Sequence, residues 1–202
     1  MFRIELSQQG DCMKLILFGG IQGVGKTTLL SWIKNEFAGK IKLLNPGALF
    51  RRYHYNKKIK TTQEIEELIV NKLGKMPNDS AVVVHWHYAV RRPSRYIPQI
   101  SFSRLKRIAE SGNIEKIVLL LVSAPVDIVR ERRLKDSRKK KRAFSRSAIR
   151  KEVAADEKFL IKHQILFSQI LGDSNVKVVR LINNDLQTTR LFLGNLFESM
   201  LS

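Results

Sequence analysis

A single eight-residue segment constrains this chain more than any other part of its sequence. It reads Gly20-Ile21-Gln22-Gly23-Val24-Gly25-Lys26-Thr27 and matches the pattern G-x-x-x-x-G-K-[S/T] at every specified position. Residues 14–18 (KLILF) before it are typical of a short buried strand, and Leu29, Leu30 and Ile33 after it have helical spacing. A strand, a glycine-rich turn and a helix in this order predict a phosphate-binding loop.

The residue types in this loop suit a nucleoside triphosphate. Glycines allow backbone conformations that direct several N–H groups at phosphate oxygens, and the following helix adds its positive end. Lys26 is expected to reach the β- and γ-phosphates, Thr27 to ligate Mg²⁺ through its hydroxyl, and Thr28 to add a further hydrogen bond. The predicted ATP-binding residues of the loop are Gly20, Ile21, Gln22, Gly23, Val24, Gly25, Lys26, Thr27 and Thr28.

Strands and helices are expected to alternate along the rest of the chain. Short apolar runs predict four more buried strands, at residues 41–44, 81–84, 116–122 and 176–182. Helices are expected between them, one starting at the capping box Thr61–Glu64 and others at 101–111, 126–134, 147–171 and 185–200. This order predicts an α/β P-loop NTPase fold, a five-stranded parallel sheet with helices on both faces and a basic lid.

One domain is expected over residues 13–202, preceded by an extension over residues 1–12. The start of the chain lacks the apolar core of a secretory signal, and no apolar run approaches the roughly 20 residues that span a bilayer. The single cysteine, Cys12, cannot form an internal disulfide. These features predict a cytoplasmic protein without a membrane partner.

Basic residues are in large excess and unevenly spread. The chain has 37 Lys and Arg against 18 Asp and Glu, and residues 130–151 alone contain twelve basic and two acidic residues. Such an excess favours polyanionic partners such as nucleotides, nucleic acid or acidic membrane surfaces, although a solvated basic face is the plainer interpretation.

From Lys14 onward the chain resembles the archaeal adenylate kinases, a branch of the nucleoside monophosphate kinases. Beyond the phosphate-binding loop, residues 45–50 (NPGALF) are similar to the family's N-F-G-x-x-M/F. Residues 84–96 (VHWHYAVRRPSRY) are similar to V-D-T-H followed by K-T-P-x-G-Y, and residues 132–138 (RRLKDSR) to R-R-L-x-D-x-x-R. The resemblance implies an ATP-dependent phosphotransferase, with an acceptor-binding segment over about 45–76 and a lid over about 135–147. It further implies transfer of the γ-phosphate of Mg-ATP to a nucleoside monophosphate, AMP first among them.

Arginines are the natural catalytic groups for this chemistry. Phosphoryl transfer needs charge neutralisation and positioning on segments that close over the site, and no covalent residue. Lys26, Arg133 and Arg138 are the predicted catalytic residues, and Arg130 and Arg142 are further predicted contacts to ATP. Arg130 is included because it shares a helical face with Arg133.

The acceptor site is predicted from a second group of residues. Arg51, Arg52 and Arg91 are expected to bind the acceptor phosphate. His87 corresponds to the family's histidine at the end of the third strand, where ligands bind in open α/β sheets, and a purely structural role is the alternative. Tyr96 is expected to pack against the acceptor base or to serve loop packing.

The chain departs from the family at the end of the third strand. The family has an aspartate there that helps to hold Mg²⁺ through its water shell, and this chain has His85. A neutral imidazole is a poor partner for Mg²⁺. Asp127 or another acid would have to substitute, or the reaction is slow or absent. Trp86 in place of the family's threonine suggests an altered acceptor pocket.

Two other functions stay open at this stage. The lid run 139–142 (KKKR) carries more charge than a mononucleotide requires, which suggests an RNA-associated ATPase or RNA-end kinase. Only Phe144 lies near that run as an aromatic residue, so the sequence shows no stacking platform there. The third function is a nucleotide-binding relative that has lost most catalysis. The sequence specifies neither the acceptor base nor an oligomeric state.

Overall fold

The computed structural model describes residues 13–76, 81–136 and 143–201 of the chain. Five parallel strands form the central sheet in the order β2-β3-β1-β6-β7. These strands are β1 (Met13–Gly19), β2 (Ile41–Leu44), β3 (Ala81–His85), β6 (Ile114–Ser123) and β7 (Val176–Ile182). The predicted α/β fold with a five-stranded parallel sheet is thereby confirmed.

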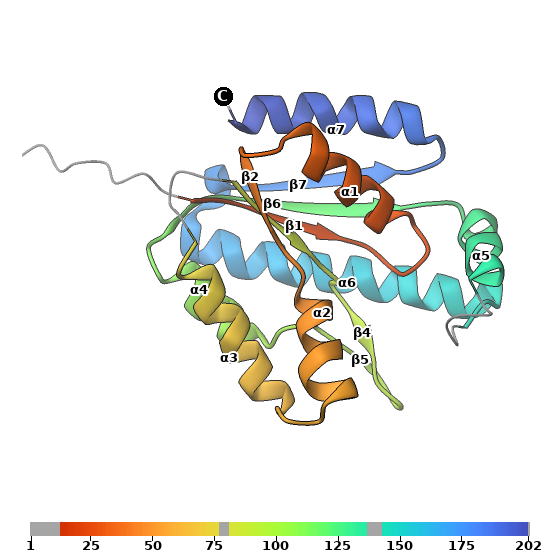
Figure 1. The fold of residues 1–202 in the computed structure, drawn as a ribbon, viewed down its shortest axis with the longest axis horizontal. Helices are drawn as coiled ribbons and strands as arrows, with labels where there is room; N and C mark the ends of the chain where they lie inside the picture. The colour runs from red at the N-terminus through yellow and green to blue at the C-terminus, as the bar shows by residue number, and fades with distance from the viewer. Residues whose placement is uncertain (1–12, 77–80, 137–142, 202) are drawn as a thin grey trace, which may run out of the picture.

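The helices that connect the strands cover both faces of the sheet. Figure 1 shows α1 and α7 on one face, and α3, α4 and α6 on the other. The helices are α1 (Lys26–Glu36), α2 (Pro46–Phe50), α3 (Thr62–Leu73), α4 (Phe102–Ala109), α5 (Val126–Lys135), α6 (Arg146–Leu171) and α7 (Leu186–Leu201), with a short 3-10 turn, η2 (Asp173–Asn175).

Alternating strand residues fill the two apolar layers. Leu15 and Leu17 of β1 belong to the cluster under α3, α4 and α6, whereas Ile16 and Phe18 belong to the cluster under α1 and α7. This follows from the period of two of a strand, which directs successive side chains to opposite faces. Residues 15–18 of β1 are therefore buried against helices on both faces of the sheet, as their continuous apolar sequence predicted.

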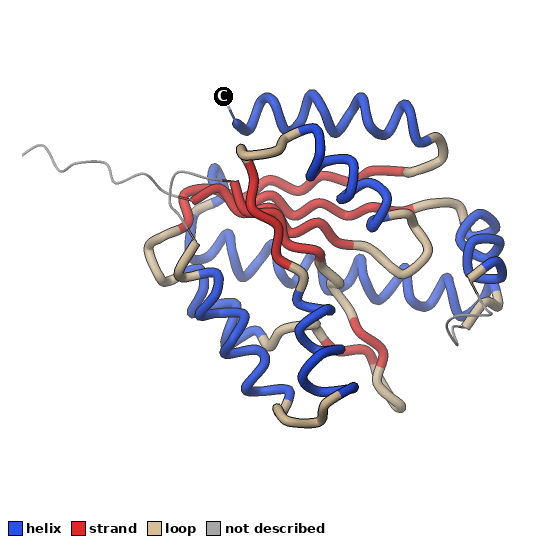
Figure 2. The backbone as a smooth tube through the Cα atoms, in the orientation of Figure 1, coloured by secondary structure: helices blue, strands red, loops and turns tan. Residues whose placement is uncertain are grey.

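Three of the short elements that the sequence did not predict lie near the carboxyl ends of β2 and β3. Helix α2 runs directly into a π-helical turn, η1 (Arg51–Asn56), and a small antiparallel hairpin joins β4 (Val90–Arg91) to β5 (Tyr96–Ile97). Asn45 caps α2, since its side-chain oxygen accepts a hydrogen bond from Ala48 N at 3.0 Å. Figure 2 shows how these elements extend below the sheet.

The topology creates a crevice between β1 and β3. After β1 the chain turns to α1 on one face, and after β3 it turns to the hairpin on the other face. Neighbouring parallel strands whose connections diverge leave a space at their carboxyl ends, where ligands bind in open α/β folds. The phosphate-binding loop leaves β1 at this point, and His85 ends β3 beside it, pairing with Phe18.

Candidate active site

The phosphate-binding loop depends on glycines in the left-handed region. Gly20, Gly23 and Gly25 have φ angles of 138°, 94° and 96°. A side chain at Gly20 would also collide with the carbonyl oxygen of Val122 on β6. The sequence pattern of the loop therefore reflects both backbone conformation and the close approach of a neighbouring strand.

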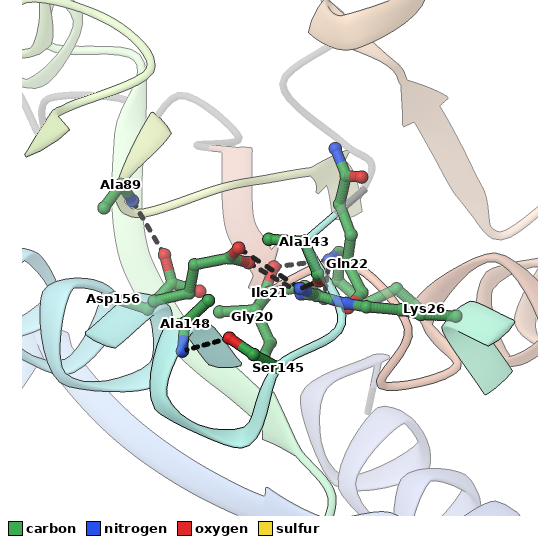
Figure 3. Close-up of polar contacts among 11 residues, drawn as sticks. Gly20, Ile21, Gln22, Lys26, Ala89, Ala143, Ser145, Ala148 and Asp156 are labelled. Carbon is green, nitrogen blue, oxygen red and sulfur yellow. Dashed lines mark hydrogen bonds and ion pairs between the residues drawn. The ribbon is translucent and has the colours of Figure 1, made fainter. Parts of the chain in front are cut away.

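The lysine and threonines of the loop lie where a nucleotide's phosphates would bind. Lys26 is only 4% exposed, and its Nζ donates hydrogen bonds to the carbonyl oxygens of Ile21, at 2.9 Å, and Gly20 (Figure 3). Thr27 and Thr28 are exposed and line a cavity of about 890 Å³ that we call the donor cavity. The lysine ammonium is thus held inside the loop, at the position from which it could exchange backbone carbonyls for phosphate oxygens.

A buried asparagine that the sequence reasoning missed fixes the loop from the other side. Asn183 follows β7, is 3% exposed, and donates from Nδ2 to the carbonyl oxygen of Val24 at 2.8 Å. Its Oδ1 accepts a hydrogen bond from Thr189 of α7 at 3.3 Å. No local motif marks Asn183, because its role depends on the pairing of β6 with β7.

His85 at the end of β3 and His87 just after it face the crevice, whereas Trp86 and Tyr88 face the core. The rings of His85 and His87 lie 5.9 Å apart, and both residues line the donor cavity. Trp86 and Tyr88 are buried in the cluster under α6. The expected effect of Trp86 on the acceptor pocket is therefore wrong, because alternation along this segment turns its ring away from both cavities.

His85 is a neutral group in this environment. Burial, together with repulsion from the neighbouring cations Lys26 and Arg51, lowers its pKa to about 4. Near neutral pH the side chain therefore adds no charge to the donor cavity. The positive charge there comes from the lysine and arginine side chains.

Arg133 is bound tightly against the phosphate-binding loop. Its guanidinium is almost completely buried, and all five of its N–H groups are used: two on Gln22 O (3.0 and 2.8 Å), one on Ala143 O (2.7 Å) and two on the Glu152 carboxylate (3.2 and 2.6 Å). Figure 3 labels two of these partners, Gln22 and Ala143. Arg133 lies within reach of the predicted site but is engaged by protein groups, so its catalytic role stays a prediction.

Another arginine of α5 faces the donor cavity more directly. Arg132 lines that cavity and donates from Nη1 to Gly23 O at 3.4 Å. Arg130, the residue predicted from helical spacing, lines neither the donor cavity nor the second cavity described below. Two residues along a helix means a rotation of about 200°, so Arg130 and Arg132 cannot face the same side. The geometry favours Arg132 for an ATP contact.

Three of the five predicted acceptor residues line a second cavity of about 370 Å³, which we call the acceptor cavity. His87, Arg91 and Tyr96 line it, together with Tyr55 of η1 and the Arg133–Glu152 pair. Arg51 lines the donor cavity instead. Arg52 lines neither, and its guanidinium lies 5.2 Å from the centre of the Tyr53 ring.

The two cavities adjoin each other. Ile21, Gln22 and His87 line both of them, so the tip of the phosphate-binding loop separates the donor side from the acceptor side. Arg138 and Arg142, with residues 137–142 of the predicted lid, lie outside the described residues, as do Cys12 and the expected extension over residues 1–12.

A buried carboxyl group behind the hairpin was also missed by the sequence reasoning. Asp156 of α6 is 2% exposed and accepts a hydrogen bond from Ala89 N at 2.8 Å through Oδ1 (Figure 3). Its Oδ2 has no hydrogen-bond partner among the described residues. Burial raises the pKa of this carboxyl group to about 7. It ties the chain after β3 to α6 and so positions the hairpin.

The residues present fit a magnesium ion that arrives with a nucleotide. Thr27 places a hydroxyl in the donor cavity, and Asp136 is the one carboxylate among the described lining residues. Asp127, the predicted substitute for the missing strand-end acid, pairs with Arg146 at 2.7 Å and does not line the cavity. No group of three or more metal-ligating side chains occurs in the described part of the chain. Mg²⁺ commonly keeps several waters and binds through phosphates and few protein oxygens, which this arrangement permits.

Comparison with known proteins identifies the family. The family described as "AAA domain" matches residues 19–151, which include the phosphate-binding loop, both predicted acceptor segments and helix α5. The chain belongs to this AAA domain family. Among solved structures, a putative kinase from Chloroflexus aurantiacus J-10-fl shares the fold, with a TM-score of 0.51 and 12% identity over 95% of this chain and 98% of that one.

Curated relatives of this AAA domain are adenylate kinases. The chain is 27% identical over 186 residues to adenylate kinase from Saccharolobus solfataricus, covering 83% of this chain and 90% of that protein. It is 23% identical over 145 residues to adenylate kinase from Methanopyrus kandleri, covering 66% of this chain and 73% of that one. The resemblance to archaeal adenylate kinases is thereby confirmed, and the likenesses support an ATP-dependent phosphotransferase of the P-loop nucleotide kinase class. None of the described helices is both long and apolar enough to cross a bilayer.

Proposed function

We propose that this protein is an adenylate-kinase-like nucleoside monophosphate kinase that transfers the γ-phosphate of Mg-ATP to a monophosphate, AMP first among the candidates. The observation that carries the proposal is the shared wall of the two cavities. Because Ile21, Gln22 and His87 line both, a triphosphate on the loop and a phosphate in the acceptor cavity would approach each other around the tip of one loop. Holding two reactants at such a position supplies much of the rate of a two-substrate reaction.

On the donor side, we assign the triphosphate to the loop backbone, Lys26 and Arg132. The lysine would leave the carbonyl oxygens of Gly20 and Ile21 for the β- and γ-phosphates, and Arg132 would add charge at the γ-phosphate. Mg²⁺ would be held by Thr27 and the phosphate oxygens, where it supplies charge neutralisation. Arg133, with Arg138 and Arg142 of the lid, remains our candidate for the transferring phosphate.

On the acceptor side, we assign the monophosphate to Arg51 and Arg91, with His87 at the boundary between the two cavities and Tyr96 against the base. The segment of residues 45–76 then serves the acceptor through Arg51, and residues of about 135–147 serve as the lid. Arg52, which packs on Tyr53 away from both cavities, would act through charge at a distance. We place the reaction in the cytoplasm, as the sequence suggests.

The test is ADP formation from Mg-ATP, alone and with each of AMP, GMP, CMP and UMP. Lys26→Ala serves as the blank, because the lysine faces the phosphates and its removal should abolish turnover while leaving the protein folded. Turnover that one monophosphate stimulates, and that the blank lacks, would establish the kinase and name its acceptor. An unchanged rate in Lys26→Ala would refute the assignment of the loop.

A catalytically weakened nucleotide-binding relative is the second candidate, and His85 is the observation that favours it. The neutral imidazole occupies the strand end where the family's magnesium-orienting acid is expected. This candidate predicts a thermal shift with Mg-ATP and no stimulation by any monophosphate. The two candidates therefore differ in the same assay.

A further inference from the structure

The acceptor side of the molecule carries a cluster of exposed cations that we call the basic rim. It consists of Arg51, Arg52, Lys57, Lys58, Arg91 and Arg95. The first four belong to η1 and the turn after it, and the last two belong to the hairpin. Tyr55 of η1 and Arg91 of β4 line the same cavity, so these two segments meet at the acceptor cavity.

The basic rim lacks compensating acids. Residues 45–60 and 85–101 contain no Asp or Glu. None of the six side chains forms an ion pair with a carboxylate in the described ranges of the chain. Elsewhere the opposite holds: Arg104 and Arg107 on α4 both pair with Glu67 of α3, at 3.0 and 2.8 Å. A local excess of unpaired positive charge of this kind raises the concentration of anionic ligands nearby.

Aromatic side chains lie among these cations. The lid sequence, in contrast, has only Phe144 near its basic run. Tyr55 is 57% exposed beside the acceptor cavity, and its ring packs edge-on against His54 with centroids 5.0 Å apart. Tyr96 lines the same cavity from the hairpin. Lys58 ends the turn with a φ of 52°, the one positive value at a non-glycine position among the described residues, and both Lys57 and Lys58 are exposed there.

We infer that the basic rim binds the backbone of a single-stranded polynucleotide whose terminal nucleotide occupies the acceptor cavity. Proteins that bind single strands combine a positively charged track for phosphates with aromatic faces on which bases stack, and the rim supplies both. A nucleoside monophosphate carries about two negative charges, so six exposed cations exceed what one mononucleotide can use. The placement of the terminal nucleotide rests on the proposed function of the acceptor cavity, and the binding along the rim does not.

The experiment measures binding of labelled single-stranded RNA and DNA of about twelve nucleotides, each with a 5′-phosphate, by fluorescence anisotropy at several salt concentrations. The rim variant is Lys57→Gln/Lys58→Gln/Arg95→Gln, which spares the residues assigned to the acceptor phosphate. The matched control is Lys34→Gln/Lys40→Gln/Lys177→Gln. It removes the same charge from the opposite end of the sheet, at the end of α1 and the starts of β2 and β7.

Each lost phosphate contact makes the slope of log K against log salt less steep by about 0.7, which near 0.1 M salt corresponds to about a fivefold loss in affinity. The rim variant loses three such contacts, so its affinity should fall about 100-fold. The control should lose much less. Tyr55→Ala should lose about tenfold while Tyr55→Phe keeps the stacking face and the affinity. The RNA and DNA probes distinguish the two sources of the same chemistry.

Several results would overturn the inference. The first is no binding of the strand at low salt, and the second is an equal loss of strand affinity in the rim variant and the control. The third is that phosphatidylserine vesicles compete with the strand and bind the protein more tightly than the strand does. A mononucleotide that is phosphorylated but does not compete with the strand would refute the placement of the terminal nucleotide. The mononucleotide kinase assay on the same variants keeps the two proposals apart. The rim variant should retain that activity, and absence of kinase activity in the wild type with intact strand binding would refute the proposed function alone.

Discussion

The ion pair between Arg133 and Glu152 offers a direct test of how the phosphate-binding loop is held in place. Glu152→Gln keeps the shape of the side chain and one acceptor oxygen but removes the charge and one of the two hydrogen bonds to the guanidinium. Arg133 is almost fully buried and Glu152 is 20% exposed. A hydrogen bond to a charged group contributes about 1.5–3 kcal/mol. The three bonds to backbone carbonyls remain, so the cost stays below the roughly 3–5 kcal/mol of an orphaned buried charge.

We therefore expect Glu152→Gln to lower the free energy of unfolding by about 2 kcal/mol and the melting temperature by about 6 °C. Urea unfolding followed by circular dichroism measures the first quantity and a thermal scan the second. The matched control is Glu131→Gln, the same chemical change in an exposed pair with Lys135 on α5. That variant should match the wild type, since exposed pairs contribute little.

A double-mutant cycle with Arg133→Leu decides whether the contact itself is responsible. If the ion pair stabilises the protein, the double variant should be about 2 kcal/mol more stable than the sum of the losses in Glu152→Gln and Arg133→Leu predicts. Effects that add to within about 0.5 kcal/mol, or a loss in Glu152→Gln no larger than in Glu131→Gln, would refute the reasoning. If Arg133 exchanges Glu152 for phosphate during the reaction, the destabilised Glu152→Gln protein should also bind ATP more tightly than the wild type.

Three further predictions concern the buried acid, the loop and the end of β3. The raised pKa of Asp156 means that the native state favours the protonated form, so stability should fall as pH rises from about 4 to about 7, by on the order of 4 kcal/mol in total. Asp156→Asn should remove that fall in urea unfolding across this range, and an unchanged pH dependence would contradict the assignment. Gly20→Ala should cost about 3 kcal/mol or more and abolish ATP binding by calorimetry, because the φ angle is 138° and the Val122 carbonyl oxygen blocks the new methyl group. His85→Asp should raise turnover about tenfold if the missing acid limits magnesium positioning, and no gain in steady-state kinetics would point to a different magnesium arrangement.

Much of the fold was determined by local patterns. Residues 15–18 of the first strand are continuously apolar because they are buried on both faces, and that pattern is visible without knowing its neighbours. The capping box at Thr61 forms as predicted, with Glu64 Oε2 accepting from the backbone N–H of Thr61 at 2.7 Å. Helix α2, η1 and the hairpin were not predicted, since they are too short for a periodic signal and depend on packing beside β3.

The sequence by itself determined the chemistry of the phosphate-binding loop, because consecutive residues build that loop and its positive φ angles require glycine. Only the tertiary structure decided which other side chains reach it. Arg132 rather than Arg130 faces the donor cavity because of the rotation of α5 against the loop. Asn183 reaches Val24 because β7 pairs with β6, and residues 159 positions apart then lie side by side. Such contacts join distant segments, and no local pattern encodes the distance between them.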